Sequence, residues 1–73
     1  MNKLDLHGVR HGDVQQEVDH FLFENNDRLP LQIVTGNSGR MKEIVIEVLN
    51  DYDYKYRVGD FLGFNQGYIE IYG

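Results

Sequence analysis

Four short segments have the hydrophobic pattern of β-strands. Polar and apolar residues alternate over 3–7, 54–58 and 68–72, which is the period-two pattern of a half-buried strand. The segment 31–36 is apolar, partly β-branched and ends at a glycine. We therefore expect four strands, with the last two joined as an antiparallel hairpin through the glycine-punctuated segment 59–67.

Two segments between these strands have helical periodicity. In the first, Asp13 is predicted as the N-cap, and one helical face carries Val14, Val18, Phe21 and Leu22. In the second, which follows Gly39, the apolar face carries Met41, Ile44, Val45, Val48 and Leu49. Ile46 lies off that face, so we expect it to be partly exposed or to contact a partner.

The order β-α-β-α-β-β predicts an α/β two-layer sandwich formed by residues 1–73 as a single domain. Right-handed βαβ crossovers put both helices on one face of a mixed four-stranded sheet. The other sheet face is then open to solvent, to a protein partner or to a second copy of the chain. On it we expect Lys3, Lys55, Arg57, Tyr68 and Tyr72.

Composition and charge restrict the function. Twelve acidic residues against seven basic ones give a net charge of −5, so binding to nucleic acid requires local clustering of the few bases. The absence of cysteine excludes a disulfide framework and a cysteine zinc site. With no signal-like or membrane-spanning apolar run, the expectation is a cytoplasmic protein that does not enter a membrane.

Candidate chemistry lies where the first two strands end. Asp5 and His7 share one face of the first strand, just before Gly8. The second strand ends in a short turn that leads into a helix N-terminus, a place that favours phosphate. The residues predicted to contact phosphate are Gly8 after the first strand and, at this turn and the helix start, Thr35, Gly36, Asn37, Ser38, Gly39, Arg40 and Lys42. If the two strands are neighbours, both motifs face one crevice.

Two interpretations of Asp5 and His7 remain open. They are solvated polar positions at a strand end, or they are catalytic residues that cleave a phosphodiester. In the second case His7 acts as general acid or base, because its reference pKa lies near neutral pH. Asp5 then orients His7, keeps it charged or binds a divalent ion. Two residues do not make a metal site, so Mg²⁺ or Mn²⁺ is treated as optional.

Three segments together resemble the small MutS-related (Smr) domain. They are LDLHG (4–8), IVTGNSG (33–39) and GFNQGYIEIY (63–72), and the resemblance runs from about Leu4 to Tyr72. The family's Asp-x-His element corresponds to Asp5 and His7. Its glycine loop corresponds to Thr35, Gly36 and Gly39, in a short variant that lacks the lysine of the His-Gly-Lys-Gly form.

The resemblance implies a fold like the C-terminal domain of translation initiation factor three. It also implies DNA or RNA as the partner, with nicking or endoribonuclease activity. A non-catalytic interaction module of the same fold is the alternative, favoured by the acidic charge and the missing loop lysine. Lys55 and Arg57 on the open face would add nucleic-acid contacts. Phe61, Leu62 and Phe64 would stack on unpaired bases or pack against the end of the core.

Overall fold

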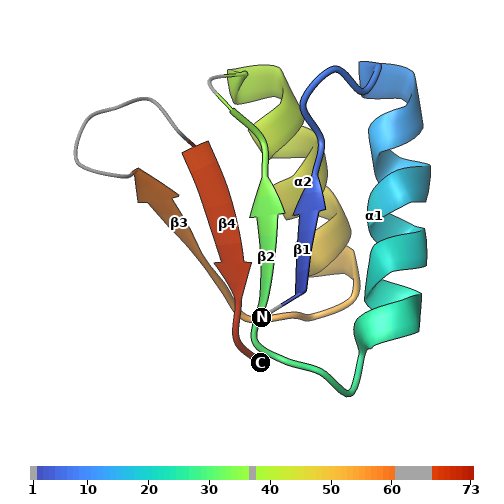
Figure 1. Cartoon of the computed structure of the whole chain (residues 1–73), viewed down its shortest axis with the longest axis vertical. Coiled ribbons are helices and arrows are strands. Elements are labelled where there is room, and N and C mark those ends of the chain that lie inside the picture. Colours follow the sequence, from blue (N-terminus) through green and yellow to red (C-terminus); the bar gives the residue numbers. More distant parts are fainter. Residues whose placement is uncertain (1, 37, 61–66) are drawn as a thin grey trace.

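The computed structural model of the chain describes residues 2–36, 38–60 and 67–73 (Figure 1). Its elements follow the order predicted from the sequence. They are β1 (Asn2–Asp5), α1 (His11–Asn25), β2 (Leu31–Val34), α2 (Gly39–Asp51), β3 (Tyr56–Asp60) and β4 (Gly67–Ile71).

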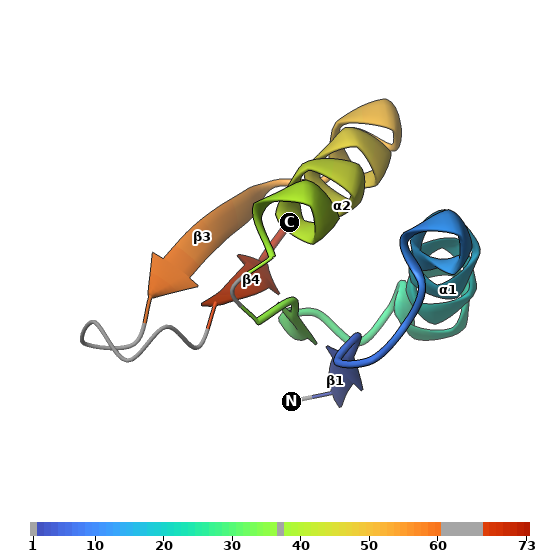
Figure 2. The same cartoon turned by 90° about the horizontal axis from the view of Figure 1, so that it is seen from above.

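The strands form one mixed, open sheet in the order β1-β2-β4-β3. β1 pairs with β2 in parallel, whereas β4 pairs antiparallel with both β2 and β3. Figure 2 shows both helices on the same side of this sheet, with α1 beyond the β1 edge. The predicted α/β class, the mixed sheet and the β3–β4 hairpin are therefore confirmed. The segment 61–66 lies outside the described residues.

The core lies between the sheet and the helices. Leu31, Ile33, Ile69 and Ile71 alternate along β2 and β4 and are fully buried, and burying such a side chain contributes about 1.5–3 kcal/mol. The helices and the end of β1 add Val14, Val18, Leu22, Met41, Val45, Val48, Leu49 and Leu6. Phe21, Ile44 and Ile46 are partly buried against this cluster, so the helical faces predicted from the sequence are confirmed.

The prediction that Asp13 is the N-cap of the first helix was wrong. α1 begins at His11, with Arg10 as the N-cap residue in an extended conformation and without a side-chain cap. The backbone N–H of Asp13 already donates to the carbonyl of Arg10 at 2.9 Å, so Asp13 lies inside the first turn. A carboxylate there still stabilises the positive end of the helix dipole.

The strand ends also differ from the sequence prediction. β1 ends at Asp5, although Leu6 still donates its N–H to Val34 at 2.9 Å. β3 runs from Tyr56 to Asp60 and so begins two residues later than the alternation indicates. Pairing continues past the start of β3 as well, since the Lys55 N–H donates to Gly73 and the Lys55 carbonyl accepts the N–H of Tyr72.

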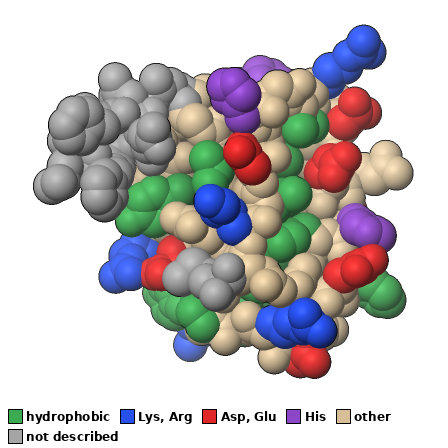
Figure 3. Space-filling model, viewed as in Figure 1, with side chains coloured by type: hydrophobic (Ala, Val, Ile, Leu, Met, Phe, Trp, Pro, Cys, Tyr) green, Lys and Arg blue, Asp and Glu red, His purple; other side chains and the backbone are tan. Residues whose placement is uncertain are grey.

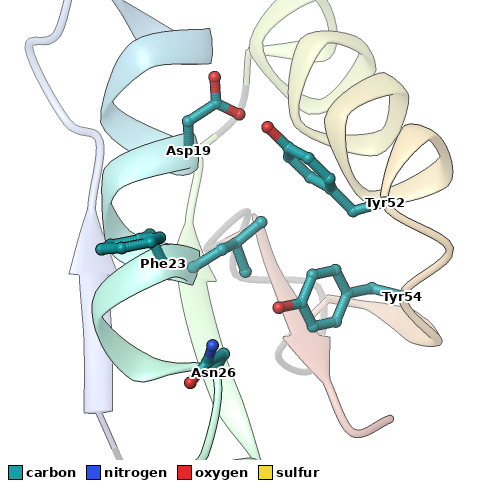
Figure 4. Close-up of a pocket in the computed structure, with 6 residues that line it drawn as sticks. Asp19, Phe23, Asn26, Tyr52 and Tyr54 are labelled. Atoms are coloured by element: carbon teal, nitrogen blue, oxygen red, sulfur yellow. The ribbon is translucent and has the colours of Figure 1, made fainter.

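A contact between Asp19 and Tyr52 joins the two helices on the side away from the sheet. Asp19 lies on α1 and Tyr52 caps the end of α2, and Figure 4 shows the Asp19 carboxylate pointing towards the Tyr52 hydroxyl. The hydrogen bond with Asp19, together with its negative charge, raises the pKa of Tyr52 above 10.0. A smaller contribution comes from the charge of Asp51.

We expect Asp19→Asn to lower the pKa of Tyr52 towards 10.0, because it removes the charge that opposes phenolate formation. The measurement is a tyrosinate absorbance titration, with NMR of the ring carbons for assignment. Because the pKa is raised on folding, the stabilisation from this contact is present below pH 10.0 and is lost as pH rises through the folded-state pKa. Asp27→Asn, at an exposed acid, is the control and should leave Tyr52 unchanged.

Candidate functional site

The candidate site is built on the edge of the sheet where β1 and β2 end and both helices begin (Figure 1). We call this region the loop edge and define it by residues 5–8, 10–11, 35–36 and 38–42. β1 and β2 are direct neighbours, with Asp5 opposite Val34, so their ends lie side by side. In the face shown in Figure 3, histidine side chains gather along the corresponding top edge.

Asp5 shapes the turn that follows β1. Its Oδ1 accepts the backbone N–H of His7 at 2.9 Å, and both residues are exposed. Gly8 then adopts a positive φ of 82°, which glycine reaches without steric cost. The Asp5 carboxylate therefore holds the backbone of His7, and the imidazole points from a fixed turn into solvent.

The end of β2 is fixed by a carbonyl from β4. Thr35 and Gly36 both donate their N–H groups to the Gly67 carbonyl, each at 3.1 Å. The Thr35 hydroxyl is buried and lies 3.4 Å from the carbonyl oxygens of both Gly36 and Gly67. Thr35 thus supports the turn from inside, and Gly36, with a φ of 68°, forms its surface.

The N-terminus of α2 opens directly from this turn. Ser38 is its N-cap, and Ser38 Oγ accepts the Met41 N–H at 3.1 Å. By helix geometry, the N–H groups of Gly39 and Arg40 have no acceptor within the helix. Apart from its own chain neighbours, a Cβ built on Gly8, Gly36 or Gly39 would meet no described atom within 4 Å, so there is open space beside the backbone at these three positions.

His11 joins the two helix N-termini, a contact that the sequence did not indicate. Its Nε2 lies 3.4 Å from Ser38 Oγ, across 27 positions of the chain. His11 is exposed beside the start of α1, and nothing in the local sequence marks it as a partner of Ser38. Only the parallel pairing of β1 with β2 brings the start of α1 next to the start of α2, so no local pattern could have identified the pair.

Two cationic side chains from the first turns of α2 lie at the loop edge. Arg40 is exposed and forms a 3.5 Å ion pair with Glu43, one turn along the helix. Lys42 extends to the start of β4, where its Nζ would lie 2.7 Å from a Cβ built on Gly67. An exposed pair such as Arg40–Glu43 contributes little to stability, so Arg40 can exchange Glu43 for another anion.

The structure does not bring Lys55 and Arg57 to the loop edge. Arg57 lies in the row Lys3–Gln32–Glu70–Arg57 across the open sheet face, and its side chain forms an ion pair with Glu70. Lys55 immediately precedes the first residue of β3 and so lies at the opposite end of the sheet from the loop edge. Asn37 was predicted to contact phosphate, and it lies outside the described residues. The same holds for Phe61, Leu62 and Phe64, predicted to stack on bases or to pack against the end of the core.

Two further properties concern the part of the chain that the structure describes. Neither helix there has the length and apolar character needed to cross a membrane. Within the same ranges, no group of three or more histidine, aspartate and glutamate side chains is close enough to hold a metal ion.

Comparison with protein-family models, with curated proteins and with solved structures gave no significant match. The likeness of LDLHG and TGNSG to the Smr motifs therefore remains an expectation from the sequence.

The close packing of Gly67 leads to a stability prediction. A Cβ at this position would lie 2.3 Å from the Gly36 carbonyl oxygen, a backbone atom. We expect Gly67→Ala to destabilise the domain by about 1–3 kcal/mol, the usual cost of overpacking, measured by urea unfolding. Gly39→Ala, which has open space around its Cβ, is the matched control and should cost less than about 1 kcal/mol. Equal stabilities for the two variants would contradict this account of the turn.

Proposed function

We propose that this chain is an Smr-like domain that binds the phosphodiester backbone of DNA or RNA at the loop edge and cleaves it there. A fold like that of the C-terminal domain of translation initiation factor three, and action in the cytoplasm, belong to the same proposal. The single observation that carries it is the meeting of three features: the Asp5–His7 turn, the Gly36 turn and the N-terminus of α2.

The loop edge has the groups that recognise a phosphate. The outward N–H groups of Gly39 and Arg40 and the positive end of the helix dipole favour an anion. Arg40 supplies a planar guanidinium beside them, and Lys42 a second positive charge at the start of β4. Because Gly36 and Gly39 present no side chain, a phosphate oxygen can reach the backbone directly.

His7 is the candidate for proton transfer in cleavage. Its side chain is exposed next to the turn, and imidazole exchanges protons near neutral pH. As general base it would take the proton of the attacking oxygen; as general acid it would give one to the leaving oxygen. The helix amides would stabilise the extra charge on the pentacoordinate phosphorus. Mg²⁺ or Mn²⁺ remains an optional addition.

A non-catalytic binding module is the second candidate function, and one contact favours it. The Asp5 carboxylate bonds to the backbone N–H of His7, so it acts as a turn former. Asparagine could fill this role, because its amide oxygen accepts the same hydrogen bond. If Asp5→Asn cleaves nucleic acid as well as the wild type does, the charge of Asp5 takes no part in catalysis.

The activity test is incubation of the purified protein with labelled single-stranded RNA, labelled single-stranded DNA and supercoiled plasmid, each with and without Mg²⁺ or Mn²⁺. We expect His7→Ala to lower the cleavage rate about a hundredfold or more, the scale of a lost general acid or base, with little change in binding. His20→Ala is the matched control, since His20 is exposed on α1 and pairs with Glu24. Equal cleavage by wild type and His7→Ala would leave the binding module as the function.

Binding itself is tested through its salt dependence. We expect Arg40→Gln to weaken nucleic-acid binding and to reduce the slope of log affinity against log salt by about 1, because one phosphate contact is lost. Fluorescence anisotropy with a labelled oligonucleotide measures both quantities. Arg28→Gln removes the same charge beside Asp27, after the end of α1, and should change neither. An affinity independent of salt would contradict phosphate-driven binding.

A further inference from the structure

A pocket of about 290 Å³ opens between the two helices, away from the loop edge. Asp19, Leu22 and Phe23 of α1 line one side, followed by Asn26, while Tyr52 and Tyr54 from the connection after α2 line the other (Figure 4). Drug-sized ligands occupy pockets of about 300–1,000 Å³, so this one suits a single side chain. In Figure 4 both tyrosine rings face α1, and the Phe23 ring is turned away from them at the rim.

One polar atom of the pocket lacks a partner. Oδ1 of Asp19 is buried and has no hydrogen-bond partner among the described residues, although the carboxylate also interacts with Tyr52. A buried charged oxygen without a donor is costly, and native structures normally supply one. The Asp19 carboxylate makes this wall of the pocket negative, so a cationic group bound there would neutralise its charge.

The other walls favour a flat cation. Tyr52 and Tyr54 present aromatic rings, and a guanidinium both stacks on such rings and is attracted to their faces. Its planar set of N–H groups can donate to a carboxylate such as that of Asp19 while the ring faces contact the guanidinium plane. A lysine ammonium would lack the planar fork and lose more hydration.

The surroundings favour an arginine that belongs to a protein. Asp51 and Asp53 lie on either side of Tyr52 in the chain, and the charge of Asp51 acts on Tyr52; this field repels phosphates and free carboxylates alike. At the rim, Phe23 is 81% and Tyr52 54% exposed, which offers apolar contact to the residues around an inserted side chain.

The left-handed conformation of Asp53 supports the same interpretation. Its φ is 62°, in the left-handed region where asparagine and aspartate are enriched among residues other than glycine. Asp53 lies directly between the two tyrosines of the pocket. The end of α2 is closed by two backbone hydrogen bonds, in which the N–H of Asp53 donates to Asn50 and the N–H of Tyr54 donates to Leu49. The chain reversal there brings both rings to the same side, facing α1.

We propose that this pocket, between Asp19 of α1 and Tyr52 and Tyr54 after α2, is a docking site for an arginine side chain of a partner protein. The site is separate from the loop edge, so it does not depend on the nucleic-acid proposal. A basic segment of a partner protein could then bind at the pocket between the helices while the loop edge stays accessible.

The test is an NMR titration of the ¹⁵N-labelled protein with the capped peptide acetyl-Gly-Arg-Gly-amide. The citrulline peptide is the comparison, because citrulline has the same shape without the charge. We expect the arginine peptide to shift the amide signals of 19–26 and 52–54, and the citrulline peptide to bind at least about tenfold more weakly, the scale of a lost charge-assisted hydrogen bond. Free L-arginine should also bind more weakly, since its carboxylate meets Asp51 and Asp53.

Variants distinguish the pocket from general charge attraction. Asp19→Asn should weaken peptide binding about tenfold, and Asp27→Asn, an equal loss of charge at an exposed position, should not. Phe23→Ala should weaken it by a smaller factor without loss of folding, because the ring is exposed. Equal binding of the citrulline peptide, wild-type affinity in Asp19→Asn, tighter binding of free L-arginine, or shifts spread over the whole surface would each overturn the proposal.

Discussion

The carbonyl oxygen of Gly67 accepts two backbone N–H groups, and the rest of the loop edge depends on this contact. The Thr35 N–H continues the register with β4, and the Gly36 N–H then turns in to the same oxygen, so the β2–β4 ladder ends at this point. After this turn, Ser38 occupies the N-cap position of α2. Because a Cβ on Gly67 would collide with the Gly36 carbonyl and the Lys42 side chain, only glycine permits this approach. Gly67, near the C-terminal end of the sequence, therefore helps to position the N–H groups at the start of α2.

The helices separate two surfaces of different chemistry. Their N-termini lie at the loop edge with His11, Arg40 and Lys42, whereas the far part of α1 and the end of α2 carry the pocket with Asp19 and Tyr52. The dipoles reinforce this division, because each helix is positive where it begins and negative where it ends. A molecule with a net charge of −5 can in this way offer an anion a local site and still present an acidic face elsewhere.

The sequence predicted the fold well because the fold depends on periodicity. The spacing of Val14, Val18 and Leu22 and the alternation of Ile69 and Ile71 state directly which faces are buried. The same patterns placed the β1 and β2 ends at one edge once the parallel crossover was assumed. Helix capping is harder to predict from the sequence. Arg10 occupies the N-cap without a side-chain hydrogen bond, so the usual capping residue is absent from that position, and Asp13 fits the capping pattern better although it lies inside the helix.

Side-chain pairs across the sheet could not be predicted, because strand register is not contained in any one segment. Register puts Arg57 beside Glu70, which neutralises a base expected to face nucleic acid. It also puts Gly59 beneath Tyr68, whose ring occupies the space where a Cβ would stand, so this tyrosine covers a glycine instead of standing free for stacking. With these two groups occupied, the open face has less to offer a phosphate chain than its composition indicates. The phosphate site proposed at the loop edge depends instead on backbone amides, which supply what the few basic side chains do not.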